Sequence, residues 1–322
     1  MRNKTVLVTG GAGFIGSHLV RRLVAEGARV TVVVKYRSLI DAPRLAGVWD
    51  DLELVEADLR NLDSVLALGG KTYDRVYHLA AYNHVGDSFT HVQEAMGANA
   101  MATANLMEHG PEAGRFVYIA SSEVYGWQTE VPFRETSRPF PISPYAVGKY
   151  AGELYAHMKR HQTGGEIICL RPFNTFGPYQ SERAVIPELI WKCLRGEPVE
   201  TTQGKQTREF NFVENIVDGF IAAGTVEKAP EESVNLGSGE EIAIVDLVRL
   251  IHRLTESKSE LRIGTLPDRP TEIWRMAADA SRAKELLGWE PAVNFEEGMQ
   301  RTVDWFRRFL EIYRGPEGLT KL

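Results

Sequence analysis

Short apolar segments and longer amphipathic segments alternate along the first half of the chain. The apolar segments are rich in Val and Ile and poor in polar residues, which is typical of strands buried on both faces of a sheet. These predicted strands span residues 5–9, 29–34, 52–56, 74–81, 115–122 and 166–172.

Helical periodicity fills the intervals between these strands. In residues 14–26, Leu19 and Leu23 recur on one face, and Gly27 stands where a helix would end. Residues 99–109 and 145–162 also read as helices. Repeated strand–helix–strand units with buried strands predict an α/β fold with a doubly wound parallel sheet, covered on both faces.

The second half of the chain is less regular. Helices are predicted at 186–195 and 244–255, and the segments 210–224 and 232–239 read as a return of the chain to the sheet. We therefore predict a first domain at residues 1–172 with 210–237 returning to it, and a smaller interleaved C-terminal lobe made of 173–209 and 238–322.

Composition and charge mainly exclude partners and compartments. The formal net charge of −6 over 322 residues argues against nucleic acid and anionic membrane as partners. Cys169 and Cys193 have neither metal-ligand nor redox spacing, so we expect core thiols in a reducing compartment. With no secretory leader pattern and no apolar run of membrane-spanning length, the expected location is the cytoplasm.

Three glycines follow the first predicted strand in the stretch TGGAGFIG. Gly10, Gly13 and Gly16 lie between that strand and a predicted helix. This arrangement is typical of the first turn of a Rossmann-type fold, in which glycines let the backbone approach a pyrophosphate at a helix N-terminus. We predict dinucleotide binding here, with Phe14 and Ile15 beside the cofactor. A glycine-rich turn without a ligand is the alternative.

The end of the second strand bears on the choice of cofactor. An acidic residue there would bind the ribose 2′-hydroxyl of NAD, but the sequence has Lys35, Tyr36 and Arg37. Two cations suit the 2′-phosphate of NADP, so NADP is preferred over NAD; solvated loop charges are the alternative. Asp58 and Leu59 fall where an adenine edge could be contacted, although Asp58 could equally cap a helix.

The stretch SPYAVGKY contains a candidate catalytic pair. Tyr145 and Lys149 are four residues apart and share one face of a predicted helix. A tyrosine with its ordinary pKa of about 10 is a poor base, but a nearby ammonium and an oxidised nicotinamide favour the phenolate. The pair follows a strand that ends in Ser121-Ser122, which strengthens the prediction of a proton acceptor.

These stretches resemble the extended short-chain dehydrogenases/reductases that act on nucleotide sugars. The resemblance runs from the first strand to near the C-terminus, through TGGAGFIGSHLV, HLAAYNHVGDSF, SSEVYG, SPYAVGKYAGE, LRPFNTFGP, REFNFVENIVDG, NLGSG and DASRAKELLGWEP. It implies a nucleotide-diphosphate sugar as substrate and a homodimer. It also implies further cofactor contacts at Leu79, Ala80, Ala81 and Pro172, besides Tyr145 and Lys149.

Three details of the resemblance concern the reaction. Glu123 directly after Ser121-Ser122 is similar to the 4,6-dehydratase pattern, and so is the loop NHVGDSF. The segments RAVIP and DRPTE resemble GDP-mannose-type dehydratases. Ser122 departs from dTDP-glucose 4,6-dehydratases, which have an acidic Asp at that position. UDP-glucuronate decarboxylases also carry Ser-Glu here, so a decarboxylase stays open beside a 4-epimerase.

The resemblance also implies how the substrate is held and converted. The diphosphate would be bound by Asn174, Arg208 and Arg269, because arginine can meet two phosphate oxygens. Further substrate contacts are predicted at His84, Ser121 and Val185, although His84 could be a satisfied loop histidine. No histidine spacing suggests a metal. In this reading Tyr145, Lys149 and Ser121 oxidise sugar C4 with the nicotinamide, and Glu123 removes the C5 proton as water leaves C6.

Overall fold

The computed structural model describes residues 1–35, 38–128, 130–267 and 273–312. Its centre is a seven-stranded sheet in which every pairing is parallel, in the order β13-β8-β7-β5-β1-β2-β3. The predicted α/β fold with a doubly wound parallel sheet is confirmed. The strands are β1 (Thr5–Thr9), β2 (Arg29–Val34), β3 (Leu52–Glu56), β5 (Arg75–His78), β7 (Phe116–Ile119), β8 (Ile167–Pro172) and β13 (Val234–Leu236).

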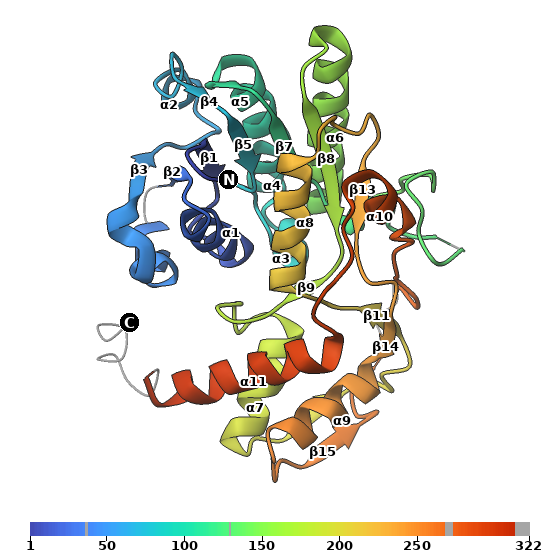
Figure 1. Ribbon diagram of the computed structural model, residues 1–322. Helices are drawn as coiled ribbons and strands as arrows, with labels where there is room; N and C mark the ends of the chain where they lie inside the picture. Colours follow the sequence, from blue (N-terminus) through green and yellow to red (C-terminus); the bar gives the residue numbers. More distant parts are fainter. Residues whose placement is uncertain (36–37, 129, 268–272, 313–322) are drawn as a thin grey trace.

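Side chains that alternate along the strands fill two separate cores, one on each face of the sheet. Val6 and Val8 of β1 belong to the larger core, which includes residues of α1 (Phe14–Ala25) and α8 (Val213–Thr225). Leu7 between them points the other way, into a core shared with α5 (Ala102–His109) and α6 (Pro144–Thr163). Because strand side chains alternate with a period of two, one apolar run serves both faces. Figure 1 shows the helices on either side of the sheet.

The helix predicted at 99–109 begins earlier in the structure. α4 (Val92–Met96) continues through a π-helical turn, η2 (Gly97–Met101), into α5. Asn99 in this turn lies against α6, where a Cβ at Gly152 would come within 2.7 Å of the Asn99 carbonyl oxygen. Glycine at that position therefore allows the two helices to approach closely, and π-turns of this kind often occur at functional sites.

The prediction that residues 210–224 return to the sheet is wrong for most of that segment. Only β12 (Asn211–Phe212) is a strand there, and it pairs with β9 (Thr175–Phe176) outside the main sheet. The rest forms α8, in which Val213, Ile216, Val217 and Phe220 are buried at helical spacing. The chain rejoins the sheet at β13, which pairs with β8.

The lower part of the molecule in Figure 1 is built from α7 (Val185–Arg195), α9 (Ile244–Leu254) and α11 (Phe295–Ile312) with small sheets. The division into two lobes at the stated residues stays a prediction. The remaining elements are η1 (Ser38–Asp51), α2 (Leu62–Leu66), β4 (Thr72–Tyr73), α3 (Val85–Ser88), β6 (Glu112–Ala113), η3 (Ser122–Tyr125), β10 (Val199–Thr201), β11 (Thr207–Glu209), β14 (Glu241–Ala243), β15 (Leu261–Ile263) and α10 (Ser281–Leu287).

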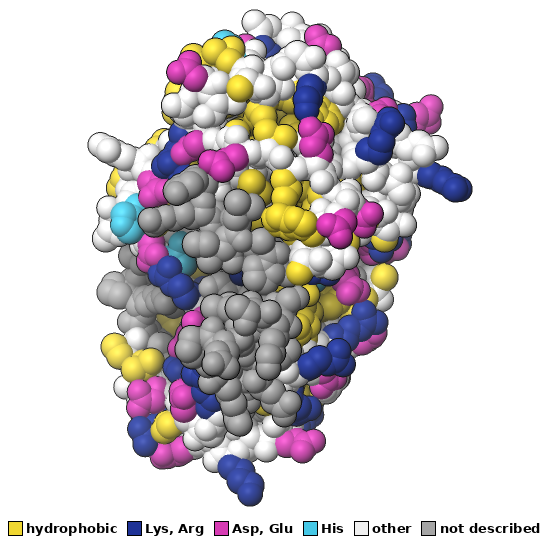
Figure 2. All heavy atoms as spheres, turned by 90° about the vertical axis from the view of Figure 1, so that its left-hand side faces the viewer, with side chains coloured by type: hydrophobic (Ala, Val, Ile, Leu, Met, Phe, Trp, Pro, Cys, Tyr) yellow, Lys and Arg dark blue, Asp and Glu magenta, His cyan; other side chains and the backbone are white. Residues whose placement is uncertain are grey.

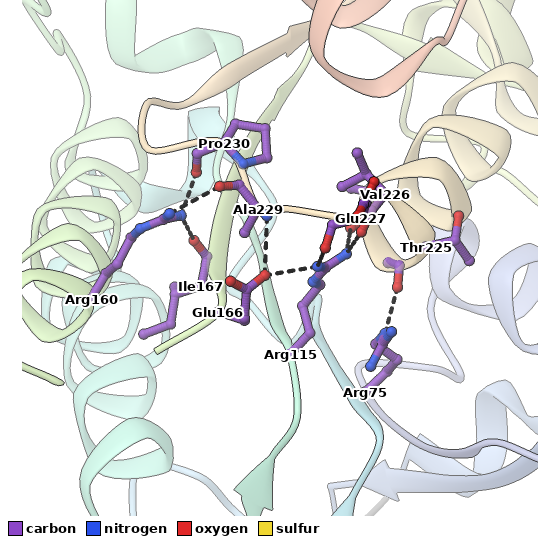
Figure 3. A network of polar contacts seen from close by, with 12 residues as sticks. Arg75, Arg115, Arg160, Glu166, Ile167, Thr225, Val226, Glu227, Ala229 and Pro230 are labelled. Carbon is purple, nitrogen blue, oxygen red and sulfur yellow. Dashed lines mark hydrogen bonds and ion pairs between the residues drawn. The ribbon is translucent and has the colours of Figure 1, made fainter. Parts of the chain in front are cut away.

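Three arginines hold the connection from α8 to β13 at the amino ends of the strands (Figure 3). Arg75 donates to the carbonyl of Gly224, and Arg115 donates to those of Ala223, Val226 and Glu227. Arg160 donates to Ala229 and Pro230. We call this group the arginine clamp. It supplies hydrogen-bond donors to carbonyls at the end of α8, which have no partner within the helix.

Acidic and basic side chains stand beside one another on the described part of the face shown in Figure 2. Each helix within the described residues is too short or too polar to cross a lipid bilayer. Cys169 and Cys193 are buried free thiols, as predicted.

Candidate active site

The glycine turn after β1 is packed closely against the protein's own backbone, at the N-terminus of α1. Gly10 has a φ of +70°, and a Cβ there would lie 2.7 Å from the amide nitrogen of Ala80. A Cβ at Gly16 would lie 2.2 Å from the Gly10 carbonyl oxygen. Gly13 is the N-cap of α1 and gives no side-chain cap, so the first amides of α1 are left for another acceptor. These features fit a pyrophosphate at the helix N-terminus.

A cleft of about 270 Å³ opens beside this turn. Eight of the predicted cofactor residues line it: Gly10, Gly13, Lys35, Asp58, Leu59, Leu79, Ala80 and Ala81. The residues that sequence reasoning missed here are Ala12, Val33, Val34, Ala57, Arg60, Tyr82, Asn83, Glu94, Ala98 and Ala102. The lining side chains are mainly small and apolar, and charged side chains stand at one side. Such a cleft suits a nucleotide whose base is buried and whose phosphates are not.

Six other predicted cofactor residues lie outside the lining of this cleft, namely Tyr145 and Lys149 of α6 and the four that follow. Phe14 and Ile15 begin α1 and pack against the larger core, with the Phe14 ring 5.9 Å from that of His18. Gly16 is buried in the same helix. Pro172 ends β8 and pairs with Leu236 of β13. Their contact with a cofactor stays a prediction.

Two cations and two carboxylates gather at the charged side of the cleft. Lys35 Nζ lies 3.7 Å from Glu94 and 4.0 Å from Asp58. Arg60 lies 2.6 Å from Asp58 and 3.4 Å from Glu94, and its hydrogen bond to Asp58 lowers the pKa of that carboxyl. The positive charge predicted here from Lys35 is therefore joined by Arg60. Tyr36 and Arg37 lie outside the described residues.

Asp58 does not cap a helix, so that alternative is wrong. The N-cap of α2 is Asn61, whose side chain accepts a hydrogen bond from Ser64 N at 3.0 Å. Asp58 instead accepts from the backbone N–H of Arg60 at 3.0 Å and pairs with its guanidinium. These two contacts stabilise a tight turn in the loop after β3, beside the cleft.

Tyr145 and Lys149 lie in the first turns of α6, as predicted. Ser143 caps the helix by accepting from Ala146 N at 3.1 Å, and Pro144 occupies the first helical position. Lys149 is 4% exposed and donates to the carbonyl oxygen of Ile119 at 2.7 Å. Burial lowers the pKa of Lys149 to about 7.

The surroundings of Tyr145 hold its phenol in the neutral form. Burial raises the pKa of Tyr145 to about 12, a hydrogen bond with Ser121 acts in the opposite direction, and the Glu123 charge raises it further. Lys149 donates one of its three N–H groups to the Ile119 carbonyl. A further positive charge in the site would lower the pKa of Tyr145 and so favour the phenolate.

Ser121, Ser122 and Glu123 form the turn that leaves β7. Ser121 is the N-cap of η3 and accepts from Glu123 N at 3.2 Å, while Ser122 is buried. Burial raises the pKa of Glu123, and the nearby charge of Arg208 lowers it. The structure thus brings Glu123 within electrostatic reach of both Tyr145 and Arg208, which the sequence places on separate segments.

The predicted substrate residues differ in how their polar groups are used. The Asn174 amide donates to the Glu209 carbonyl at 3.1 Å, and Arg208 donates to the Thr207 carbonyl at 2.8 Å. His84 caps α3 by accepting from Asp87 N at 3.0 Å. Val185, the first residue of α7, is 41% exposed. Arg269 lies outside the described residues.

A buried polar chain beneath the cleft was not predicted. His78 lies 2.7 Å from Thr9 Oγ1 and 3.0 Å from Thr103 Oγ1, and burial lowers its pKa to about 3. Thr9 Oγ1 in turn accepts from Ala80 N at 3.1 Å. A neutral His78 therefore fixes the end of β1 to the wall of the cleft. The sequence does contain one signal for this buried chain, which is the presence of a histidine, His78, inside an otherwise apolar strand.

Arg171 joins α6 to β8. Its guanidinium lies 2.5 Å from Glu153 and donates to Tyr125 Oη at 2.8 Å, all three residues being buried. A buried pair of this kind fixes the relative position of the elements that carry it. Within the described residues no three His, Cys, Asp or Glu side chains gather closely enough to hold a metal ion.

The sequence of this chain matches those of known proteins. The family model described as GDP-mannose 4,6 dehydratase matches residues 7–302. UDP-glucuronic acid decarboxylase 1 of Xenopus tropicalis is 36% identical over 96% of this chain and 73% of its own. dTDP-D-glucose 4,6-dehydratase of Mus musculus is 29% identical over 98% of this chain and 92% of its own.

The fold also matches a solved structure with both ligands bound. UDP-glucuronic acid 4-epimerase from Bacillus cereus, in complex with UDP-glucuronic acid and NAD, has a TM-score of 0.85 and 28% identity, covering 94% of this chain and 99% of its own. Dehydratases, decarboxylases and epimerases are thus all among the proteins that this chain is similar to.

Proposed function

The chain belongs to the GDP-mannose 4,6-dehydratase family of extended short-chain dehydrogenases/reductases, and on this basis we propose that it is a nucleotide-sugar 4,6-dehydratase. The observation that supports dehydration is the placement of Glu123. Its carboxyl is half-buried, has a raised pKa and lies within electrostatic reach of Tyr145. A carboxylate poised in this way is suited to accept a proton from carbon.

In the proposed reaction Tyr145 accepts the proton of the sugar 4-hydroxyl, with Ser121 and Lys149 as its supporting groups. Ser121 hydrogen-bonds the phenol, and Lys149 is the buried cation one turn further along α6. Gly10, Gly13 and the cleft residues would hold the dinucleotide. The cofactor, when bound, supplies the hydride acceptor at C4, returns the hydride at C6 and adds a positive charge near Tyr145.

Glu123 carries the elimination in this proposal. A ketone at C4 acidifies the proton on C5, Glu123 accepts that proton, and the C6 hydroxyl leaves as water. Ser122 is a poor acid for the leaving hydroxyl. In the turn after β7, the proton that Glu123 has taken up is therefore the one that can be transferred to the C6 hydroxyl as it leaves. When the hydride returns to C6, C5 takes up a proton from solvent through Glu123, and Tyr145 releases the 4-hydroxyl proton to solvent. A raised pKa helps Glu123 in both directions, because it makes the carboxylate a better base and keeps the acid within reach of neutral pH.

Two other reactions share the first oxidation and are the alternatives. Decarboxylation at C6 is favoured by the 36% identity to UDP-glucuronic acid decarboxylase 1, and 4-epimerisation by the likeness to UDP-glucuronic acid 4-epimerase. Incubation with a panel of nucleotide sugars, followed by product identification, distinguishes them. A 6-deoxy-4-keto product supports the dehydratase, whereas carbon dioxide or a 4-epimer would assign the alternative.

We propose NADP as the preferred cofactor, although the similar B. cereus epimerase structure contains NAD. Lys35 and Arg60 stand at the charged side of the cleft, and Arg37 follows in the sequence. Arg37→Ala should weaken NADP by about tenfold and NAD little, because one charge-assisted contact to the 2′-phosphate is lost. Titration of both cofactors measures this. Equal losses for NADP and NAD would remove the 2′-phosphate role.

We assign Arg208 to the substrate diphosphate. Arg208→Ala should raise KM for the nucleotide sugar by about tenfold or more, with kcat nearly unchanged, if the contact is the same in ground and transition states. Cofactor affinity should stay at the wild-type value. Steady-state kinetics and cofactor titration on the same preparation measure both quantities. A collapse of cofactor affinity would mean that Arg208 supports the fold instead.

We also propose that the protein is a cytoplasmic homodimer. Met101, Val147, Leu154 and Met158 are between 41% and 58% exposed on η2 and α6, which contact each other. A second copy related by a two-fold axis would bury this apolar surface against itself. Sedimentation velocity distinguishes the 36.0 kDa monomer from a dimer.

A further inference from the structure

The backbone of Tyr145 is held on both sides by side chains from outside its own helix. Its N–H is one of the first amides of α6 and so has no acceptor within the helix. That N–H donates to Ser88 Oγ at 3.2 Å, and the Tyr145 carbonyl accepts from Asn99 Nδ2 at 3.4 Å. Ser88 is fully buried, and its hydroxyl proton goes to the Val85 carbonyl at 2.6 Å. Ser88 therefore acts toward Tyr145 only as an acceptor.

The residue before Ser88 makes a contact in the opposite direction. Asp87 binds Arg183 across 2.7 Å, and Arg183 lies two residues before α7. The two residues are 96 positions apart in the chain. Asp87 also lies 3.2 Å from His84 Nδ1, within the same turn. α3 thus contacts the segment before α7 through one side chain and the catalytic helix through the next.

We infer that Ser88 is a positioning residue for Tyr145, and that the Asp87–Arg183 pair couples this position to the segment before α7. The inference rests on the proposed role of Tyr145 as proton acceptor. A displacement of the segment before α7, as when a substrate enters beside it, would pull on Asp87. Because α3 is a single short turn, that pull reaches Ser88 and hence the Tyr145 N–H. The motif NHVGDSF, which contains Asp87 and Ser88, and the motif RAVIP, which begins with Arg183, are therefore expected to move together.

The first test measures hydrogen exchange at the Tyr145 amide by NMR, in the full chain without substrate. Ser88→Ala should speed exchange about tenfold, because the amide loses its acceptor, and Ser88→Thr should restore it. Arg183→Gln should speed exchange by about threefold in the wild-type background and have no further effect with Ser88→Ala. The same factor for Arg183→Gln in both backgrounds, or wild-type exchange in Ser88→Ala, would overturn the inference.

The second test uses catalysis and a matched control. Ser88→Ala should lower kcat about fivefold and leave KM unchanged, as expected for a group that orients the acceptor rather than binds substrate. Arg134→Gln is the control, because Arg134 is a 70% exposed arginine whose guanidinium pairs at 3.1 Å with Asp279 rather than with α3. It should change neither kcat nor amide exchange. A rise in KM without a fall in kcat for Ser88→Ala would contradict positioning.

If the wild-type protein converts no nucleotide sugar, the proposed function fails while the exchange test still applies. Amide exchange depends on the fold alone, so it separates the two outcomes. If Arg183→Gln affects Tyr145 amide exchange only when Ser88 is present, but the protein is inactive, the positioning inference stands and the proposed function fails. If the protein is an active dehydratase but the two substitutions act independently on exchange, the proposed function stands and the inference fails.

Discussion

Glu123→Gln should abolish most dehydration while leaving oxidation at C4 intact. The amide keeps the shape of the side chain but cannot accept the C5 proton, and loss of a general base typically costs about 100- to 10,000-fold. The bound cofactor should still change its absorbance when sugar is added, because that step uses Tyr145 and Lys149. Formation of the 6-deoxy-4-keto product and exchange of the C5 proton with solvent should fall together.

A glutamate remote from the cleft provides the control for this substitution. Glu108 lies on α5 and pairs with Lys159 at 2.7 Å, so Glu108→Gln should leave all three rates unchanged. Because burial raises the pKa of Glu123, the acid limb of the dehydration rate should lie at a higher pH than an ordinary glutamate would give. Elimination at the wild-type rate in Glu123→Gln would exclude Glu123 as the base.

Lys149→Met should make the protein more stable at low pH and nearly inactive. The folded pKa of Lys149 is about 7 and its ordinary value is 10.5, so the folded state binds fewer protons between these values. The free energy of unfolding therefore rises with pH across that window, and the cost of the buried charge is fully present below pH 7. The difference corresponds to about 5 kcal/mol, from which the unpaired Ile119 carbonyl subtracts about 1–3 kcal/mol.

Denaturant unfolding at two pH values tests this prediction. Lys149→Met should be more stable than the wild type by about 2–4 kcal/mol at pH 6 and by less at pH 9. Its rate of C4 oxidation should fall about 100- to 1000-fold, as when a preorganised donor is removed from an active site. Lys71→Met, at an exposed lysine, should leave the stability nearly unchanged at either pH. Equal destabilisation of Lys149→Met at both values would contradict the prediction.

The bounds of a strand could be predicted where the buried apolar residues are the same residues that pair in the sheet. Residues 5–9, 29–34 and 52–56 form strands with the predicted bounds, because their apolar runs end where the sheet ends. The strand predicted at 74–81 stops at His78, since the apolar residues that follow leave the sheet to line the cleft. Hydrophobicity reports burial, and burial in a cofactor cleft cannot be told from burial in a strand by composition alone.

In the candidate site, residues close together in the sequence could be placed from their spacing, but contacts between distant segments could not be predicted. Tyr145 and Lys149 could be placed from one helical turn, and the glycine turn from its own short motif. Ser88 could not be connected to Tyr145, because their hydrogen bond joins residues 57 positions apart. Glu123 was predicted from resemblance, but its nearness to Arg208 of β11 joins two segments that are far apart in the chain.

The arginine clamp and the candidate site lie at opposite ends of the parallel strands. Arg75 begins β5 and Arg115 precedes β7, so the clamp lies at the amino ends of the strands. Gly10 and Ser121 follow the carboxyl ends of β1 and β7. The contacts that retain α8 and β13 therefore lie at one end of the parallel strands, and the glycine turn and Ser121 lie at the other. We expect substitutions around the glycine turn or Ser121 to leave the clamp's hydrogen bonds intact, because the two sets of residues share no contact partner within the described part of the chain.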